Sequence, residues 1–143
     1  MEPREISTAQ ALRRAHEALR TDLQALEASL ARDSAENLAP IRIRLKATQT
    51  HLLEHFRFEE QNGYMEKVRN GEPRLEHAID QLAAEHRQLA GDLKSILEST
   101  NDTSCLESVG HRIREWIAAM RQHEACEDRL VQEAFNFDVG EED

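Results

Sequence analysis

The chain has 143 residues, of which 32% are charged and only 4% are aromatic, and its formal net charge is -10. This length suits one domain with a sizeable core, and the negative charge argues against a nucleic-acid backbone or an anionic membrane as partner. The first ten residues contain no apolar core of a secretory signal, and no apolar run approaches the roughly 20 residues of a membrane span. The two cysteines form no CxxC pair and are too few for a disulfide framework, so we expect a cytoplasmic protein.

Turn-forming residues divide the chain into four long segments that are rich in helix-favouring residues. The turns lie near residues 33–40, 70–73 and 99–104, and predict helices over about residues 7–33, 39–69, 73–98 and 105–137. Short connections make consecutive helices antiparallel neighbours. We therefore predict an all-α protein with a single domain over residues 1–143, folded as an antiparallel up-down-up-down four-helix bundle. The acidic residues from Gly140 onward are expected to fray.

Each predicted helix has one apolar stripe with spacings of three and four residues, as expected for a face turned toward a core. Every stripe is interrupted by a histidine; in chain order these are His16, His55, His86 and His123. Two stripes are also interrupted by a glutamate one turn later, at Glu59 and Glu127. The first two histidines lie at about the same distance from the first predicted turn, so an antiparallel pair of helices places them at one level. The six side chains are therefore predicted to meet inside the bundle.

Two carboxylates in a bundle core cost several kcal/mol each unless they are neutralised. No lysine or arginine interrupts the stripes, so the acids are either protonated or paired with a cation. Four imidazoles at the same level favour the cation, since neutral histidine is a common ligand of iron, zinc and copper and a carboxylate can bridge two metals. Six ligands are too many for one tetrahedral zinc and too few to saturate two octahedral irons. Two metal ions are therefore the better count, with oxo or hydroxo bridges or an exogenous ligand in the remaining positions.

Nearly the whole chain resembles the hemerythrin family, which includes the bacterial HHE cation-binding domains. The resemblance rests on His16, on the run HFRFEE at residues 55–60, on Glu85-His86, and on the run HEACED at residues 123–128. It implies a four-helix bundle that holds a non-haem di-iron centre. It also implies that Glu59 and Glu127 are bridging carboxylates and that the four stripe histidines are terminal ligands.

Two departures from oxygen-carrying hemerythrins concern the ligand set. Those proteins have a second histidine one turn before the third-helix ligand, where this chain has Leu82. They also have an aspartate after the last histidine, whereas here Glu127 and Asp128 are both available. One metal is therefore expected to have an open or solvent-filled position or to recruit a substitute, and His51, one turn before the second-helix ligand, is a candidate. Asp128 and Glu60 are secondary candidates, with hydrogen bonding to a histidine or a solvated position as the alternatives.

Three functions are compatible with such a centre. The first, which we favour, is binding of dioxygen or nitric oxide at an open iron position, for sensing, storage or buffering. The second is a di-iron redox enzyme that oxidises iron or reduces peroxide or nitric oxide. The third is a metal-stabilised interaction module without small-ligand chemistry. A ferritin-like centre is disfavoured, because none of the seven histidines follows a glutamate by three residues.

Overall fold

The computed structural model describes residues 8–32, 38–61, 63–101 and 106–142. Within these ranges the regular structure is entirely helical, which confirms the predicted all-α class. Four long helices form a bundle: α1 (Thr8–Arg32), α2 (Ala39–Gln61), α4 (Glu76–Ser99) and α5 (Leu106–Glu142). A short helix, α3 (Tyr64–Gly71), and one 3-10 turn, η1 (Pro73–Leu75), lead from α2 to α4. The four-helix bundle predicted from the sequence is therefore confirmed.

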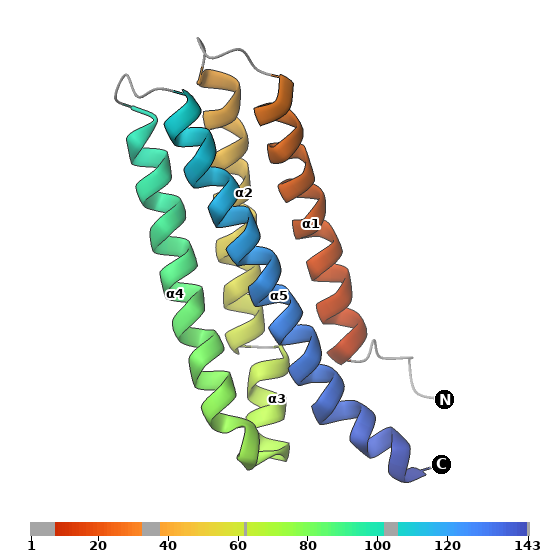
Figure 1. The fold of residues 1–143 in the computed structure, drawn as a ribbon. Coiled ribbons are helices and arrows are strands. Elements are labelled where there is room, and N and C mark those ends of the chain that lie inside the picture. Colours follow the sequence, from red (N-terminus) through yellow and green to blue (C-terminus); the bar gives the residue numbers. More distant parts are fainter. Residues whose placement is uncertain (1–7, 33–37, 62, 102–105, 143) are drawn as a thin grey trace.

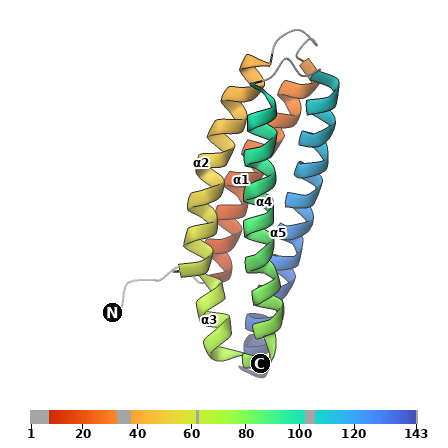
Figure 2. The ribbon, with the colours of Figure 1, turned by 90° about the vertical axis from the view of Figure 1, so that its left-hand side faces the viewer.

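Each long helix packs against two others. In Figure 1 the chain runs up along α1, down along α2 and α3, up along α4 and down along α5. Helix α1 contacts α2 and α5, and α4 also contacts α2 and α5, so α1 and α4 stand at opposite corners of the bundle. Figure 2, viewed from the side, shows α3 continuing downward below α2. This arrangement turns one face of every long helix toward a common interior. A search of the described helices finds no segment that could cross a membrane.

The predicted continuous helix over residues 39–69 is wrong, because α2 ends at Gln61 and α3 begins at Tyr64. A Cβ atom on Gly63 would lie 2.9 Å from the Glu59 Cα atom and 2.9 Å from the Phe58 carbonyl oxygen, so the chain turns here through a space that only glycine fits. In a continuous helix Tyr64 would face about 140° away from Glu59. The break resets this angle, and both side chains are buried in the core. The sequence carried a signal for the break, since Asn-Gly pairs mark turns.

The other predicted helix limits differ from the structure by a few residues or lie outside the described residues. The third predicted helix, at residues 73–98, corresponds to η1 followed by α4. The fourth was expected to end near residue 137, whereas α5 continues to Glu142, so most of the acidic tail is helical. The predicted limits at residues 7, 33 and 105 lie outside the described residues.

Buried apolar side chains form two separate clusters along the bundle axis. The upper apolar cluster occupies the end of the bundle that is uppermost in Figure 1 and consists of Leu19, Leu23, Leu26, Leu30, Ile41, Leu45, Leu52, Phe56, Leu89, Leu93, Ile96, Val109, Ile113, Trp116, Ile117 and Met120. The lower apolar cluster includes side chains of α3 and consists of Leu12, Tyr64, Met65, Val68, Leu75, Ile79, Leu82, Leu130, Val131 and Ala134. Along α1, His16 lies between Leu12 of the lower cluster and Leu19 of the upper one. A polar layer therefore separates the two clusters.

Candidate metal centre

Six titratable side chains from the four long helices make up this polar layer. Helix α1 contributes one of them, α2 two, α4 one and α5 two; they are His16, His55, Glu59, His86, His123 and Glu127. Both glutamates are fully buried, and the most exposed of the four histidines, His55, is only 9% exposed. Each side chain replaces an apolar residue in the stripe of its helix, so the helical period that builds the core also turns these groups inward. The structure thus brings together all six primary candidates from the sequence.

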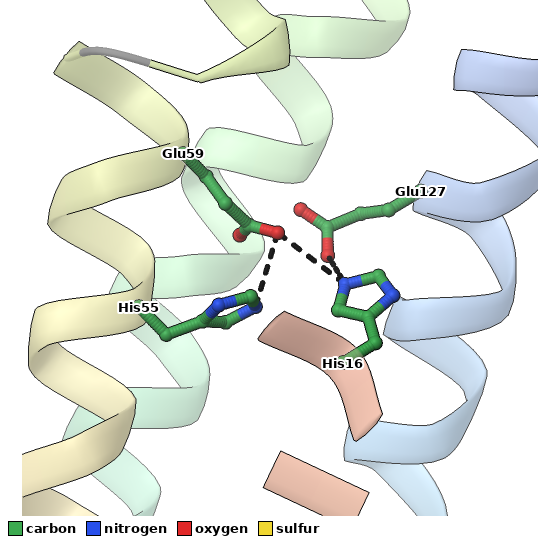
Figure 3. A group of neighbouring side chains, drawn as sticks. All are labelled: His16, His55, Glu59 and Glu127. Carbon is green, nitrogen blue, oxygen red and sulfur yellow. Dashed lines mark hydrogen bonds and ion pairs between the residues drawn. The ribbon is translucent and has the colours of Figure 1, made fainter. Parts of the chain in front are cut away.

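The six side chains form two groups of closely spaced donors. In the first group, His16, His55, Glu59 and Glu127 place one donor atom each within 4.8 Å of one another. Figure 3 shows these four side chains pointing toward a common centre from α1, α2 and α5. The Nε2 atom of His55 lies 3.0 Å from Oε2 of Glu59, and the Nε2 atom of His16 lies 3.0 Å from Oε1 of Glu127. All four donors therefore converge on one small volume.

The second group pairs the same two glutamates with the other two histidines. Donor atoms of Glu59, His86, His123 and Glu127 also lie within 4.8 Å of one another. The Nε2 atom of His86 is 3.1 Å from Oε1 of Glu59 and 3.3 Å from Oε2 of Glu127. The Nε2 atom of His123 is 3.4 Å from the same Oε2 atom of Glu127. Each histidine pair thus belongs to one group, whereas both glutamates belong to both.

Three carboxylates contact the outer ring nitrogen, Nδ1, of three of the histidines. Oxygen atoms of Asp128, Glu60 and Glu85 lie 2.9, 2.6 and 2.7 Å from the Nδ1 atoms of His16, His86 and His123, respectively. A carboxylate at Nδ1 accepts a hydrogen bond from that nitrogen and leaves the lone pair of Nε2 directed inward, as a metal ligand requires. Asp128 and Glu60, the secondary ligand candidates, therefore lie behind the imidazoles and not in the donor groups. Sequence analysis did not foresee the position of Glu85, although it directly precedes His86.

The structure does not support His51, a secondary candidate from the sequence, as a metal ligand. Its side chain is 57% exposed, and its Nδ1 atom lies 2.8 Å from Oδ2 of Asp22 on α1. One helical turn separates it from His55, but the small angular offset between residues four apart is enough to move it from the core to the outer edge of the α1–α2 contact. It does not join either donor group.

Comparison with protein families assigns the chain over nearly its whole length. The model of the hemerythrin HHE cation-binding domain matches residues 7–135. The chain belongs to this family. The resemblance found in the sequence is confirmed, and cation binding is the property that the family description carries. Neither curated proteins nor solved structures gave a match.

Several donor atoms of this HHE domain lie close together without a hydrogen-bond partner. Among the described residues, the Nε2 atoms of His55 and His123 and both carboxylate oxygens of Glu59 are buried and make no hydrogen bond. Buried polar atoms normally have a partner, and an unmade hydrogen bond costs about 1–3 kcal/mol. Nitrogen and oxygen atoms that converge on one space, several of them without a hydrogen bond, are what a bound cation needs. The residues present therefore fit a metal centre.

The electrostatics of the HHE domain also favour a positive charge at this place. Burial lowers the pKa of His16, but its hydrogen bond to Glu127, its close contact with Glu59 and the charges of both carboxylates outweigh burial and raise that pKa to about 10. The same balance raises the pKa of His86 to about 10. Without a metal ion, protons on the imidazoles thus offset the two glutamates at neutral pH. Cations take the place of these protons, so metal binding releases them.

Two aromatic side chains shape the immediate surroundings of the donors. The hydroxyl group of Tyr64 donates a 2.7 Å hydrogen bond to Oε2 of Glu127. Burial, together with the negative charges of Glu127 and Glu59, raises the pKa of Tyr64 well above its usual value, so the phenol stays neutral and remains a donor. The ring of Phe56 stacks on that of His86, with 3.8 Å between ring centroids and 9° between the planes. These contacts fix the orientation of one bridging candidate and one histidine.

A third buried carboxyl group lies beside the donors. Glu124 is 4% exposed, and its Oε2 atom has no hydrogen-bond partner among the described residues. Burial raises the pKa of Glu124, against the opposing influence of His16, His55 and Arg20. Sequence analysis missed this residue, although its position three residues before Glu127 places both acids on one side of α5.

A small cavity reaches the polar layer from the side of α1 and α3. It has a volume of about 170 Å³ and is lined by residues of α1, α2 and α3, among them Leu12, Glu59, Gly63, Tyr64 and Lys67. Glu59 of the polar layer and Tyr64 of the lower apolar cluster line this cavity, while the carboxylate oxygens of Glu59 stay buried behind its wall.

Proposed function

We propose that this HHE domain holds two iron ions in its polar layer and binds dioxygen or nitric oxide at an open iron position. His16 and His55 would hold one ion, His86 and His123 the other, and Glu59 and Glu127 would bridge them. The observation that carries this proposal is the membership of both glutamates in both donor groups. A single ion would leave one histidine pair buried and unused, at a cost in free energy.

The donor chemistry supports iron as the metal. All six donors are imidazole nitrogens or carboxylate oxygens, a mixture that suits non-haem iron, and no thiolate takes part. Each ion would receive two imidazoles and two shared carboxylates, fewer protein ligands than the six of an octahedral site. Two ferrous ions in these positions would supply vacant coordination sites and the electrons needed to bind dioxygen or nitric oxide reversibly.

The surroundings of the layer support a small, uncharged ligand. Leu82 is buried beside the donors and belongs to the lower apolar cluster. The cavity bordered by Glu59 and Tyr64 is large enough for a diatomic molecule, and the two apolar clusters limit water on either side of the layer. Tyr64 and the outer carboxylates keep the donors oriented while a ligand enters. A binding role of this kind suits sensing, storage or buffering.

Metal analysis and ligand difference spectra test this function directly. The purified protein, loaded anaerobically with Fe²⁺, should contain two irons per chain. Exposure to air or to nitric oxide should then produce charge-transfer bands in the near-ultraviolet and visible range. The His55→Ala variant should bind fewer ions and show weaker bands, whereas His111→Ala, at a histidine that is 74% exposed, should behave like the wild type. An unchanged spectrum in iron-loaded protein would contradict ligand binding, and a protein that takes up no transition metal would instead favour an interaction module.

A redox enzyme at the same centre is a second candidate, and the residue that favours it is Leu82. A leucine in place of a ligand leaves a position free for a substrate as well as for a reversibly bound gas. Steady-state consumption of peroxide or nitric oxide, with a reductant present, distinguishes turnover from stoichiometric binding. The cytoplasmic location expected from the cysteine usage stays a prediction.

A further inference from the structure

The four histidines of the polar layer differ in whether a carboxylate contacts their Nδ1 atom, the ring nitrogen that faces away from the donor groups. His16, His86 and His123 each have a carboxylate at Nδ1, as described above. For His55, no such partner is present among the described residues. The histidine pair of the first donor group therefore has one outer carboxylate, whereas the pair of the second group has two. The difference in negative charge would leave a cation at the first group less well compensated.

Among the described residues, Glu124 is the one buried acid that the two donor groups do not use. It is 4% exposed, and its Oε2 atom is fully buried without a hydrogen-bond partner in the described part of the chain. Protein interiors rarely leave a carboxylate in this state, because an acid without a partner opposes burial. Such a residue calls for an explanation that the apolar core does not give.

The position of Glu124 on α5 places it on the side of the first donor group. Asp128 follows it by four residues and its Oδ1 atom lies 2.9 Å from the Nδ1 atom of His16, so Glu124 leaves the helix on the side of α1. On α5 it lies between His123 and Glu127, three residues before the latter, so both glutamates leave the helix on the same side. Glu124 is not a member of either donor group, so its carboxylate is not already used there.

We propose that Glu124 is a seventh donor of the metal centre and ligates the cation held by His16 and His55. This inference rests on the proposed two-ion function. A glutamate side chain has three rotatable torsions, and the proposal requires a turn about them that brings the unpaired oxygen to the first group, with the helix unchanged. The cation would be the partner that the buried carboxylate lacks. Glu124 would also supply the first group with the negative charge that is missing at Nδ1 of His55.

If Glu124 ligates the first ion, the two ions have different numbers of protein ligands. The ion at the first group would have two imidazoles and three carboxylates, whereas the ion at the second group would have two imidazoles and two carboxylates. The more open position then lies at the ion of His86 and His123, which is also the side where Leu82 replaces a ligand. The proposal therefore assigns the small ligand to the second ion.

Anaerobic titration of the metal-free protein with Fe²⁺, and in parallel with Co²⁺, tests the assignment. The wild type should bind two ions, and Glu124→Gln should keep one affinity unchanged while the other falls by at least about 10- to 100-fold, because an outer partner of a ligand alone contributes that much. Glu17→Gln is the matched control, because Glu17 follows His16 directly but is exposed, and the substitution removes the same charge. Its two affinities should equal those of the wild type.

Double variants show which ion Glu124 serves. In the His123→Ala background the remaining ion sits at the first group, so Glu124→Gln should still weaken it. In the His55→Ala background the remaining ion sits at the second group, and the effect of Glu124→Gln should vanish. Circular dichroism checks that each variant is folded, and Glu124→Met fills the same space without an oxygen if the amide is not tolerated.

The outcomes separate this inference from the function on which it rests. Two ions in the wild type, with unchanged affinities in Glu124→Gln or Glu124→Met, would overturn the inference alone. An equal loss at both ions, or an equal loss in Glu17→Gln, would also overturn it, because either result indicates a general effect of charge. A wild-type stoichiometry below two would overturn the proposed function and this inference together.

Discussion

The upper apolar cluster and the polar layer are built by the same four helices but depend on different properties of their side chains. In the cluster, leucine, isoleucine and valine fill space, and exchange for another apolar residue of similar volume is usually tolerated. In the layer, each imidazole and carboxylate has a particular atom directed at a particular place. The cluster supplies the stability of the bundle, and the layer, which opposes folding when no cation is present, supplies its chemistry. Substitutions in the two regions should therefore separate stability from metal binding.

The largest effect on metal binding is expected from a glutamate shared by both donor groups. Glu127→Gln should weaken both ions by more than about 100-fold, since outer-shell partners alone contribute about 10- to 100-fold. Competition with a chelator measures the two affinities. Glu115→Gln, on the same helix and 67% exposed, removes the same charge and should leave both affinities as they are. Loss of only one ion would show that Glu127 does not bridge.

In the upper apolar cluster, a substitution should lower the stability of the protein and leave metal binding unchanged. Leu93 is fully buried, and Leu93→Ala should lower the free energy of unfolding by about 2–5 kcal/mol through lost contacts and a cavity. Ile43→Ala is the control, because its side chain is 70% exposed and the change should stay within about 0.5 kcal/mol. Urea denaturation gives both values. Both variants should keep the metal stoichiometry of the wild type, and a lower stoichiometry in folded Leu93→Ala would break the separation of the two regions.

The sequence predicted the inward-facing residues of both regions better than the outer carboxylates, because only the former follow the helical period. Stripes with a period near 3.6 mark every residue that faces the interior, so the six donors were found in the same way as the leucines around them. The outer carboxylates were harder to assign, because Glu60, Glu85 and Asp128 sit at half-exposed positions. In a chain with 28 acidic residues, such a position has no feature that distinguishes a histidine partner from a solvated charge.

The errors have equally specific causes. His51 was misplaced because a spacing of four residues was treated as an identical direction, although it is offset by about 40°. The break before α3 was missed because hydrophobic periodicity was given more weight than the Asn62-Gly63 pair. Glu124 was missed because it lies outside the apolar stripe of its helix, the pattern that identified the six donors.

Tyr64 joins the two regions, since it belongs to the lower apolar cluster and donates to a glutamate of the layer. Tyr64→Phe should lower the free energy of unfolding by about 1.5–3 kcal/mol, the usual range for a hydrogen bond to a charged group. Urea denaturation of the metal-free protein measures this loss. In the Glu127→Gln background the loss should shrink, because the charged acceptor is already gone. An equal loss in both backgrounds would mean that the hydroxyl acts through packing.

The smallest effect is expected from an outer carboxylate. Glu85→Gln should weaken the ion at His86 and His123 by about 10-fold, the lower end of the range for such partners, because the acid is half exposed and water can replace part of its role. Glu98→Gln, an exposed acid on the same helix, provides the comparison. Calorimetric titration resolves a change of this size. Equal affinities in the two variants would assign Glu85 to the surface after all.

The exposure of the outer carboxylates has a practical consequence. Glu60, Glu85 and Asp128 are 41%, 50% and 51% exposed, yet each is one hydrogen bond away from a fully buried imidazole. Salt, crowding or an approaching protein can reach these three acids without entering the bundle. Charge substitutions chosen only to improve solubility would therefore alter the centre when they fall at these positions, and a binding partner that covers one of them would tune the metal from outside.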